Sequence, residues 1–229
     1  MNKSIAVVMP AHNEARIISD VLSRIPAEID GISVVPIVVD DGSTDGTSDV
    51  ARRSGAIVIR HLTNLGVGAA TITGLLAAQQ LNAKVIVTMD SDGQHNPEEI
   101  PSLVRCLWDG PFDVVIGSRI IAPEGMPLSR VGANLLLNAI TFIVYGKVVS
   151  DSQSGFKAIS SDALLRIKLN SPGYEICSEF IGELHRNRLS YKSLPVKAIY
   201  TPYSKRKGQP FLNGVNLILR MFMRLLRRT

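Results

Sequence analysis

The residues best suited to chemistry are two aspartates that lie one position apart, Asp90 and Asp92. They directly follow Val85–Met89, an apolar run typical of a buried strand. Two carboxylates at a strand end can point into one site, and oxygen ligands suit Mg²⁺ or Mn²⁺ bridging a diphosphate. The same residues could instead form a turn that leads into a helix, because Asp-Gly and Asn-Pro are common loop sequences. Gln94 and His95 add two polar groups and favour the metal site.

A second polar segment, Asp40–Thr47, follows the apolar run Val34–Val39. Its glycines permit tight turns and its Ser, Thr and Asp side chains can cap the next helix, which is a purely structural use. The first two aspartates need another reason, and a carboxylate such as Asp41 at a strand end can accept hydrogen bonds from a ribose or a base. Gly66–Ala70 lacks the third glycine of a dinucleotide fingerprint. Its small residues would instead let the backbone approach a nucleotide closely.

Alternating strands and helices must position these segments. Short apolar, mostly β-branched runs predict strands over Ile5–Met9, Val34–Val39, Ala56–Arg60, Val85–Met89 and Val114–Ile116. Amphipathic stretches between them predict helices over Glu14–Ile25, Thr47–Ser54, Val67–Leu81 and Pro97–Trp108. Such alternation indicates an α/β fold with a mostly parallel sheet flanked by helices. Ligands of these sheets bind at the carboxyl ends of the strands, where the polar segments lie.

The second half of the chain is less regular. Leu128–Tyr145 is apolar but interrupted by polar residues, and we expect it to be too polar and too short to cross a membrane, lying instead against a membrane or a partner. Phe211–Arg228 has the pattern of a basic amphipathic helix. With no internal repeat and no low-complexity linker, we expect one domain over residues 1–203 and a basic loop and helix over residues 204–229.

Composition excludes several classes of protein. With 229 residues, 45% of them hydrophobic, the chain can bury one substantial core, so it is not intrinsically disordered as a whole. Its cysteines, Cys106 and Cys177, form no CxxC pair, which argues against a disulfide framework or a structural zinc site. The first apolar run ends at Pro10, too early for a signal peptide. We therefore expect a reducing, cytoplasmic environment.

The charges are unevenly distributed along the chain. Residues 1–183 hold 14 basic and 20 acidic residues, whereas residues 184–229 hold 11 basic residues and no acidic ones. A region so poor in acid points to a polyanion, an anionic membrane surface or the phosphates of a substrate. Nucleic acid is the least favoured of these partners, because aromatic residues make up only 5% of the chain and no stacking platform or recognition motif is visible.

Four motifs, in this order and at these spacings, resemble glycosyltransferase family 2, and more narrowly its dolichol- or polyprenyl-phosphate sugar transferases. They are Pro10–Glu14 (PAHNE), Asp40–Asp45 (DDGSTD), Asp90–His95 (DSDGQH) and Gly117–Arg119 (GSR). The resemblance extends over residues 4–200. It implies the GT-A fold, a Rossmann-like nucleotide-diphospho-sugar transferase fold. It also implies a nucleotide-sugar donor with GDP or UDP, a Mn²⁺ or Mg²⁺ ion, and inverting transfer of a hexose such as mannose or glucose.

The resemblance also assigns roles to residues. Those expected around the donor nucleotide are Pro10, Ala11, Glu14, Asp41, Gly66, Ala69 and Asp90. Those expected to hold the metal and the diphosphate are Asp90, Asp92 and Gln94. The expected catalytic residues are Asp92 and two phosphate-facing arginines, Arg119 and Arg130. Asp151–Lys157 resembles an acceptor-side loop, and Tyr203–Lys205 with Lys207–Gln209 resembles a basic loop that closes over the donor, with its usual arginine and Ser-Lys pair rearranged. Contacts to phosphate or acceptor are thus expected from Gln94, Lys157 and Lys205.

The acceptor class depends on whether a general base is present. A hydroxyl acceptor requires a base near the anomeric carbon, whereas a phosphate is already an anionic nucleophile at pH 7. No Glu-Asp pair stands where hydroxyl-using relatives keep their base, and Glu175, Glu179 and Glu183 have the spacing of a solvated helix face. Together with the basic residues, this favours a lipid phosphate, because arginine binds phosphate well.

A polyprenyl phosphate lies in a bilayer, so we expect peripheral association with the cytoplasmic face of the membrane through the helix over residues 211–228. The same helix could instead pack on a second protomer of a homodimer. Two other functions stay open. One is transfer to a saccharide or protein hydroxyl with Glu175, Glu179 or Asp151 as base. The other is a non-catalytic nucleotide-sugar-binding protein.

Overall fold

The computed structural model describes residues 4–123 and 126–199. Within them the chain forms one eight-stranded sheet in the order β2-β3-β1-β5-β7-β6-β8, with β4 also paired to β3. The strands are β1 (Ser4–Ala11), β2 (Glu28–Ile29), β3 (Ile32–Asp40), β4 (Ile57–Arg60), β5 (Val85–Thr88), β6 (Val114–Ser118), β7 (Lys157–Ser160) and β8 (Tyr191–Pro195). The helices are α1 (Ile18–Ser23), α2 (Thr47–Arg53), α3 (Val67–Gln80), α4 (Ile100–Asp109), α5 (Leu128–Tyr145), α6 (Ser161–Arg166) and α7 (Ile176–Arg186), with a 3₁₀ turn, η1 (Pro97–Glu99), before α4.

The sheet is mixed but mostly parallel, which confirms the expected fold class. β1 runs parallel to β3 and β5, β4 runs parallel to β3, and β6 runs parallel to β8. The main exception is β7, which is antiparallel to both of its neighbours, β5 and β6. Sequence periodicity does not reveal β7, because it has only four residues and includes a lysine.

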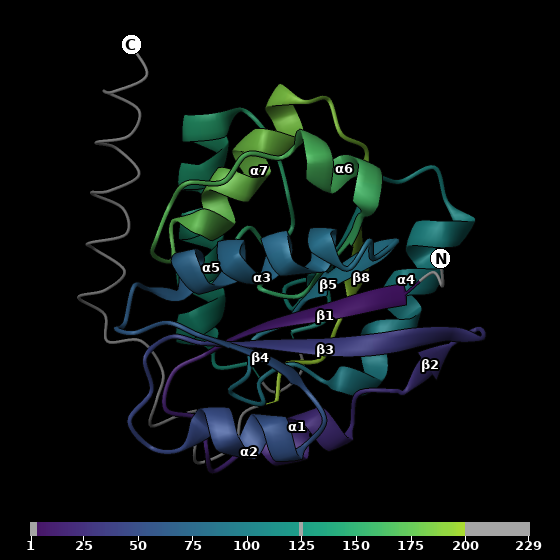
Figure 1. The fold of residues 1–229 in the computed structure, drawn as a ribbon. Coiled ribbons are helices and arrows are strands. Elements are labelled where there is room, and N and C mark those ends of the chain that lie inside the picture. Colours follow the sequence, from purple (N-terminus) through teal and green to yellow (C-terminus); the bar gives the residue numbers. More distant parts are fainter. Residues whose placement is uncertain (1–3, 124–125, 200–229) are drawn as a thin grey trace.

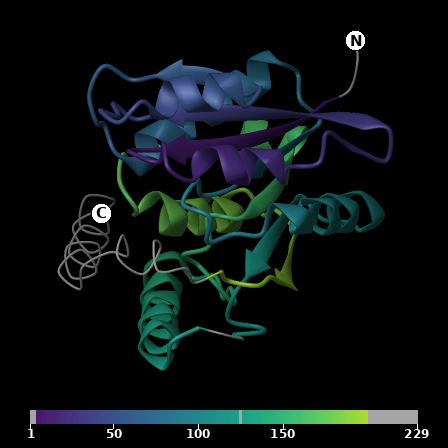
Figure 2. The same cartoon turned by 90° about the horizontal axis from the view of Figure 1, so that it is seen from below.

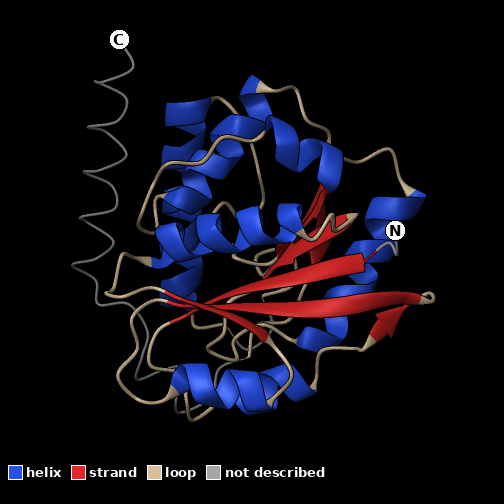
Figure 3. Ribbon diagram, viewed as in Figure 1, coloured by secondary structure: helices blue, strands red, loops and turns tan. Residues whose placement is uncertain are grey.

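Helices cover both faces of the sheet (Figures 1 and 3). Along β1, Ile5, Val7 and Met9 face a core formed with α1 and α4, whereas Ala6 and Val8 face a second core formed with α3, α6 and α7. Both faces of the central strands are therefore buried, which explains why they read as continuous apolar runs rather than as alternating ones.

The first helix is shorter than the sequence predicts. Helix α1 begins at Ile18 rather than at Glu14. The Asn13 amide donates to Ser43 Oγ (2.9 Å), the Glu14 amide to Thr47 Oγ1 (2.9 Å) and the Ala15 amide to Asp45 Oδ2 (3.1 Å). Because these amides bond to another loop, the segment that follows β1 is attached to the segment that follows β3.

Helix α5 stands at the margin of the domain, away from the sheet (Figure 2). It has 18 residues and a mean hydropathy of 1.4, and 17% of it is buried. By length and composition alone it could therefore cross a membrane, contrary to the expectation that the segment is too short and too polar. It contacts the domain through residues such as Tyr145, which packs against Gly182 of α7.

Candidate functional site

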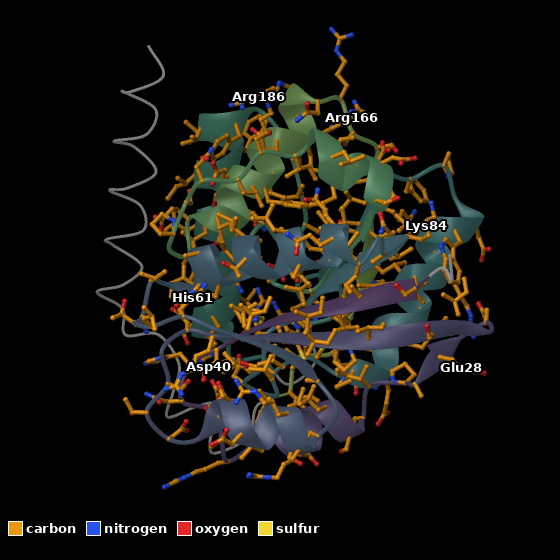
Figure 4. All side chains as sticks on the ribbon, in the orientation of Figure 1. Glu28, Asp40, His61, Lys84, Arg166 and Arg186 are labelled. Atoms are coloured by element: carbon orange, nitrogen blue, oxygen red, sulfur yellow. The ribbon has the colours of Figure 1, made fainter. Side chains whose placement is uncertain are left out.

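The polar segments converge at the carboxyl ends of the central strands. The Asp41 amide donates to the carbonyl of Ala11 (2.8 Å), and Ser91 Oγ donates to the carbonyl of Pro10 (2.7 Å). These bonds join the end of β1 to the segments that follow β3 and β5. In Figure 4, Asp40 and His61 lie at this end of the sheet, and Glu28 and Lys84 lie at the opposite end.

Asp90 and Asp92 form the acidic centre of this end. Asp90 Oδ2 lies 3.0 Å from His95 Nε2, and 42% of the Asp90 side chain is exposed. Partial burial of the carboxylate alone would raise the Asp90 pKa, but the His95 hydrogen bond and the positive charges of Arg119 and Lys157 lower it below its usual value. Burial and the negative charge of Asp90 raise the pKa of Asp92. The pair therefore concentrates negative charge at one point.

This pair fits a divalent cation of the Mg²⁺ or Mn²⁺ type. A cation between the two carboxylates would offset the repulsion that raises the Asp92 pKa. Among residues 4–123 and 126–199, no group of three or more His, Cys, Asp or Glu side chains could hold a metal ion. A pair of carboxylates nevertheless suits Mg²⁺, which is usually held by one or two carboxylates together with water and the phosphates of a substrate.

Gln94 links the acidic centre to a basic residue. Its backbone amide donates to Asp92 Oδ1 (3.0 Å), its side-chain amide donates to Asp92 Oδ2, and Arg130 Nη1 reaches its Oε1 at 3.5 Å. With its amide nitrogen toward Asp92 and its oxygen toward Arg130, Gln94 acts here as a bridge. A role for Gln94 as a metal ligand stays a prediction.

Strand β7 brings Gly155 and Lys157 to the same place. Thr88 Oγ1 donates to the carbonyl of Gly155 (2.7 Å), and a Cβ atom on Gly155 would lie 2.6 Å from Asp90 Oδ1. Lys157 is buried, and its Nζ donates to the carbonyl of Ser154. Gly155 therefore leaves the space that the Asp90 carboxylate occupies, and the positive charge of the buried Lys157 acts on that carboxylate.

Arg119 is held by Asp151. Its Nε donates to Asp151 Oδ2 (2.8 Å), its Nη2 to Oδ1 (3.0 Å) and its backbone amide to Oδ2 (3.1 Å). Asp151 is fully buried, which alone would raise its pKa, but Arg119 lowers that pKa below its usual value. Asp151 is thus an ionised partner that orients Arg119. This geometry argues against Asp151 as the general base of a hydroxyl transfer.

The aspartates after β3 serve the protein's own loops. Asp40 accepts from the Ser43 amide (2.8 Å) and from Ser48 Oγ, as in an ordinary turn. Asp41 is buried, with Oδ1 2.7 Å from His61 Nδ1 and Oδ2 accepting from the Gly66 amide (2.8 Å). These contacts organise the loop over residues 61–66, and a contact of Asp41 with a nucleoside stays a prediction.

The small residues at the start of α3 let the loop around Pro172 approach closely. The amides of Gly68 and Ala69 donate to the carbonyl of Pro172 (2.7 and 3.1 Å). A Cβ atom on Gly66 would lie 2.4 Å from that carbonyl oxygen, and one on Gly68 would lie 2.1 Å from the Ser171 carbonyl oxygen. The glycines therefore allow a close approach of protein backbone, and a contact of Gly66 or Ala69 with the donor nucleotide stays a prediction.

The glutamates of α7 do not form a solvated face, so that expectation is wrong. Glu179 and Glu183 are each only 1% exposed. Glu179 accepts from the amides of Asn170 and Ser171, and Glu183 accepts from the Lys168 amide (3.0 Å). Both carboxylates thus support the loop over residues 168–171. Glu175, at the N-terminal end of α7, is half-buried.

The chain returns to the site after β8. His95 and Ala198 form an isolated bridge, and the Ile199 amide donates to the carbonyl of Gln94 (2.9 Å). Lys205, the rest of the predicted basic loop and the segment over residues 204–229 lie outside the described residues.

The motifs did not single out His61 or Asn138, although each supports the site or its loops. Only Asn138 carries a sequence signal, because it interrupts an apolar helix.

Comparisons with known proteins match almost the whole chain. The sequence model of the family described as Glycosyl transferase family 2 matches residues 6–167. The chain is 40% identical over 225 residues to an uncharacterised protein of Methanocaldococcus jannaschii, covering 96% of this chain and 91% of that protein. It is 36% identical over 245 residues to the UDP-N-acetylglucosamine–dolichyl-phosphate N-acetylglucosaminyltransferase of Methanococcus voltae. That match covers 97% of this chain and 96% of the Methanococcus protein.

Among solved structures, the chain is similar to glucosyl-3-phosphoglycerate synthase from Mycobacterium tuberculosis in complex with Mn²⁺ and UDP-glucose. The TM-score is 0.69 and the sequence identity 27%, with 99% of this chain and 79% of that chain covered.

Proposed function

We propose that this chain, which belongs to glycosyl transferase family 2 by its match over residues 6–167, acts on a lipid phosphate. It would move a sugar from a nucleotide-sugar donor to a dolichyl or other polyprenyl phosphate. A UDP-sugar is the first donor to test, because the Methanococcus relative is named for UDP-N-acetylglucosamine and the mycobacterial structure holds UDP-glucose. The same relative is named for dolichyl phosphate, which supports the acceptor class.

The observation that carries the proposal is the bidentate pair between Arg119 and Asp151 beside the acidic centre. Transfer to a hydroxyl needs a general base, and this pair makes Asp151, one of the three candidates, a partner of an arginine instead. Glu179, the second candidate, accepts backbone amides of the loop over residues 168–171. A phosphate acceptor needs no base and needs cationic side chains, which Arg119 and Arg130 supply. Lys157 is buried, so its direct contact with the acceptor stays a prediction.

The chemistry can be assigned to residues as follows. Asp90 and Asp92 would hold a Mn²⁺ or Mg²⁺ ion, which when bound supplies a Lewis acid for the leaving diphosphate. His95 fixes the orientation of the Asp90 carboxylate through the contact of 3.0 Å. An oxygen of the acceptor phosphate attacks the anomeric carbon as the bond from that carbon to the diphosphate oxygen breaks, and attack from the opposite face inverts the configuration. Arg119 and Arg130 orient the phosphates, and Pro10, Ala11 and Glu14 are the residues we place around the nucleoside.

Helix α5 supports a membrane-bound acceptor. Its outer face carries Leu128, Leu135, Leu136, Phe142 and Ile143, whose exposed fractions range from 48% to 88%. Contiguous apolar surface of this kind marks an interaction site. The face begins near Arg130, which reaches Gln94 at the acidic centre. It then extends about 27 Å along the 18 residues of the helix. When the phosphate of the lipid binds at the site, the bilayer that holds the lipid chain would therefore lie along α5.

We further propose that α5 lies on the bilayer surface rather than across it. The opposite face of α5 packs on the domain, with Thr141 and Tyr145 buried. A spanning helix would have to leave these contacts. Both cysteines are free thiols, which supports a location at the cytoplasmic face of the membrane. The Mn²⁺ or Mg²⁺ ion, the donor and this membrane surface together make up the set of partners we propose.

The experiment is transfer of radiolabelled sugar from UDP- and GDP-sugars, with Mn²⁺ or Mg²⁺, to polyprenyl phosphate in vesicles, followed by extraction into organic solvent. We expect labelled lipid with wild-type protein and none with Asp92→Asn. Vesicles without the lipid phosphate are the matched control. Donor hydrolysis without labelled lipid would contradict the proposed acceptor and make Glu175 the first base to substitute.

A further inference from the structure

Asn138 of α5 brackets the backbone on both sides of Asp151. Its Nδ2 donates to the carbonyl of Ser150 (2.7 Å), and its Oδ1 accepts from the amide of Ser152 (2.8 Å). One side-chain amide thereby holds the peptide groups before and after the aspartate. Because both bonds are made to main chain, they determine where the Asp151 side chain starts and in which direction it points.

Asp151 then determines the position of Arg119. The carboxylate is fully buried and receives three hydrogen bonds from this one arginine, two from the guanidinium and one from the backbone amide. A bidentate pair of this kind fixes the plane of the guanidinium. Arg119 in turn lies close enough to Asp90 for its charge to act on that carboxylate. A chain of direct contacts therefore leads from α5 through Asp151 to Arg119.

A second set of hydrogen bonds holds the same loop. Thr141, one turn after Asn138, lies 3.1 Å from Ser178 Oγ of α7 and 3.3 Å from Ser152 Oγ. Gln153 Nε2 donates to both of those serine hydroxyls, at 2.9 and 3.1 Å. Helix α5 thus has two functional faces. The outer face is apolar, and the inner face binds the loop that carries Asp151.

Stability alone does not account for asparagine at this position. Asn is a poor helix former, and the half-buried polar atoms of Asn138 must lose water and then be re-bonded for a small net gain. An apolar residue would serve better in a helix whose only task was to pack against the domain. The two bonds of Asn138 do give the loop around Asp151 one defined conformation.

We propose that Asn138 is a positioning residue that, through Asp151, holds Arg119 in the orientation that receives the acceptor phosphate. Helix α5 thereby couples its lipid-facing side to the phosphate-binding arginine. This inference rests on the proposed transfer to a lipid phosphate. In this role Asn138 acts indirectly, through the main chain on either side of Asp151.

The kinetic test compares Asn138→Ala with wild type, using polyprenyl phosphate in vesicles as acceptor. We expect kcat/KM for the acceptor to fall between about tenfold and a hundredfold, the loss typical of a misplaced binding group, while the donor KM stays within about twofold. The control is Asn134→Ala, the same change one turn earlier on α5. It should behave as wild type. An unchanged acceptor KM and kcat in Asn138→Ala would overturn the inference.

A double-mutant cycle separates positioning from general support of the fold. If Asn138 acts through Arg119, then Asn138→Ala causes little further loss of kcat/KM in an Arg119→Ala background, because the interaction is already absent. Losses that multiply would mean that the two residues act independently, which contradicts the inference.

The same cycle measured by thermal unfolding does not depend on activity. We expect the shift in Tm caused by Asn138→Ala to be smaller in the Arg119→Ala background than in wild type. The reason is that Asn138 holds the main chain around Asp151 and Arg119 binds the Asp151 carboxylate. If wild-type protein forms no labelled lipid, the proposed function fails, and this unfolding cycle alone decides the inference. Shifts that simply add would overturn it, and non-additive shifts would support it.

Discussion

At the scale of single residues, the site depends on how close neighbours place and charge two carboxylates. His95 binds Asp90 from one side, and Gly155 leaves the space that the Asp90 carboxylate fills. Asp92 lies two residues away, and its pKa is raised partly by the charge of Asp90. Small changes beside this pair should therefore alter chemistry more than they alter folding.

Gly155→Ala tests this expectation. The new Cβ atom would lie 2.6 to 2.9 Å from the Asp90 carboxylate, so that side chain must move. We expect kcat to fall at least about tenfold while the free energy of unfolding drops by about 1 kcal/mol, as for a mild overpacking change. Transfer assays and urea titrations measure the two effects. Unchanged kcat would show that Asp90 tolerates the displacement and does not hold the cation.

The pair between Arg119 and Asp151 predicts a pH-dependent contribution to stability. Because Arg119 lowers the Asp151 pKa in the folded protein, the unfolded chain binds more protons at acid pH, and the stabilisation is present above the unfolded pKa of about 3.9. It is lost as the pH falls through the lower, folded pKa. Asp151→Asn should destabilise the protein by about 3 kcal/mol at pH 7, because it removes one partner of a buried pair.

Unfolding of wild type and Asp151→Asn measured from pH 7 to pH 3 checks this sign. The difference between the two proteins should be constant down to about pH 4 and should shrink below it. A difference that grew as the pH fell would mean that Asp151 is protonated in the folded protein and does not pair with Arg119.

At the scale of elements, helices α3 and α5 each combine a helical segment with a contact to a neighbouring loop. The start of α3 is closed by the Pro172 carbonyl, which accepts from two of its amides. Helix α5 binds a loop through polar residues on one face and exposes leucine, isoleucine and phenylalanine on the other. The first arrangement bears on stability, and the second bears on the proposed membrane contact.

Gly68→Ala should destabilise the protein by about 2 kcal/mol, because its Cβ atom would lie 2.1 Å from the Ser171 carbonyl oxygen and backbone must move. The matched control is Gly132→Ala in α5, where a Cβ atom meets nothing within 4 Å. That change should stabilise the helix by up to about 1 kcal/mol. Thermal unfolding of both variants measures the difference, and equal shifts would argue against close packing at Gly68.

Replacing Leu136 and Ile143 by aspartate should weaken binding to anionic vesicles at least about tenfold, because their burial in the bilayer is lost. The control is Leu165→Asp, the same kind of change at an exposed residue of α6. Co-sedimentation with vesicles measures binding, and circular dichroism confirms folding. If all variants bind equally, the membrane contact is made elsewhere in the chain.

At the scale of the whole molecule, the site is assembled from segments that the sheet brings together. Loops after β1, β3 and β5 are bonded to one another, and β7 and the segment after β8 complete the surroundings of Asp90–His95. A ligand that bridges these segments binds only the folded protein and must therefore stabilise it.

We expect UDP with Mn²⁺ to raise the Tm, by the equivalent of about 2.7 kcal/mol at a hundredfold excess over Kd. A chelator should remove most of the increase, and Asp92→Asn should lose the part that depends on Mn²⁺. Differential scanning fluorimetry with UDP and GDP side by side also ranks the two donors. A chelator-insensitive increase in Tm would argue against the cation site at Asp90 and Asp92.

The sequence by itself determined the local features of this protein. Short apolar runs located five of the strands, because the central strands of the sheet are buried on both faces. The aspartates at Asp90–Asp92 could be placed at a strand end for the same reason. The four motifs were sufficient to indicate the family and the α/β fold, since each is contiguous in the chain.

Only the tertiary structure decided which distant groups meet. Antiparallel insertion of β7 placed Gly155 and Lys157 beside Asp90. Folding of the loop around Asp151 paired that aspartate with Arg119, and burial of Glu179 overturned its interpretation as a solvated residue. An apolar pattern indicates that a residue is buried, and a glycine indicates that another group of the protein or a ligand approaches the backbone closely. The partner depends on strand order and packing, which are properties of the whole chain.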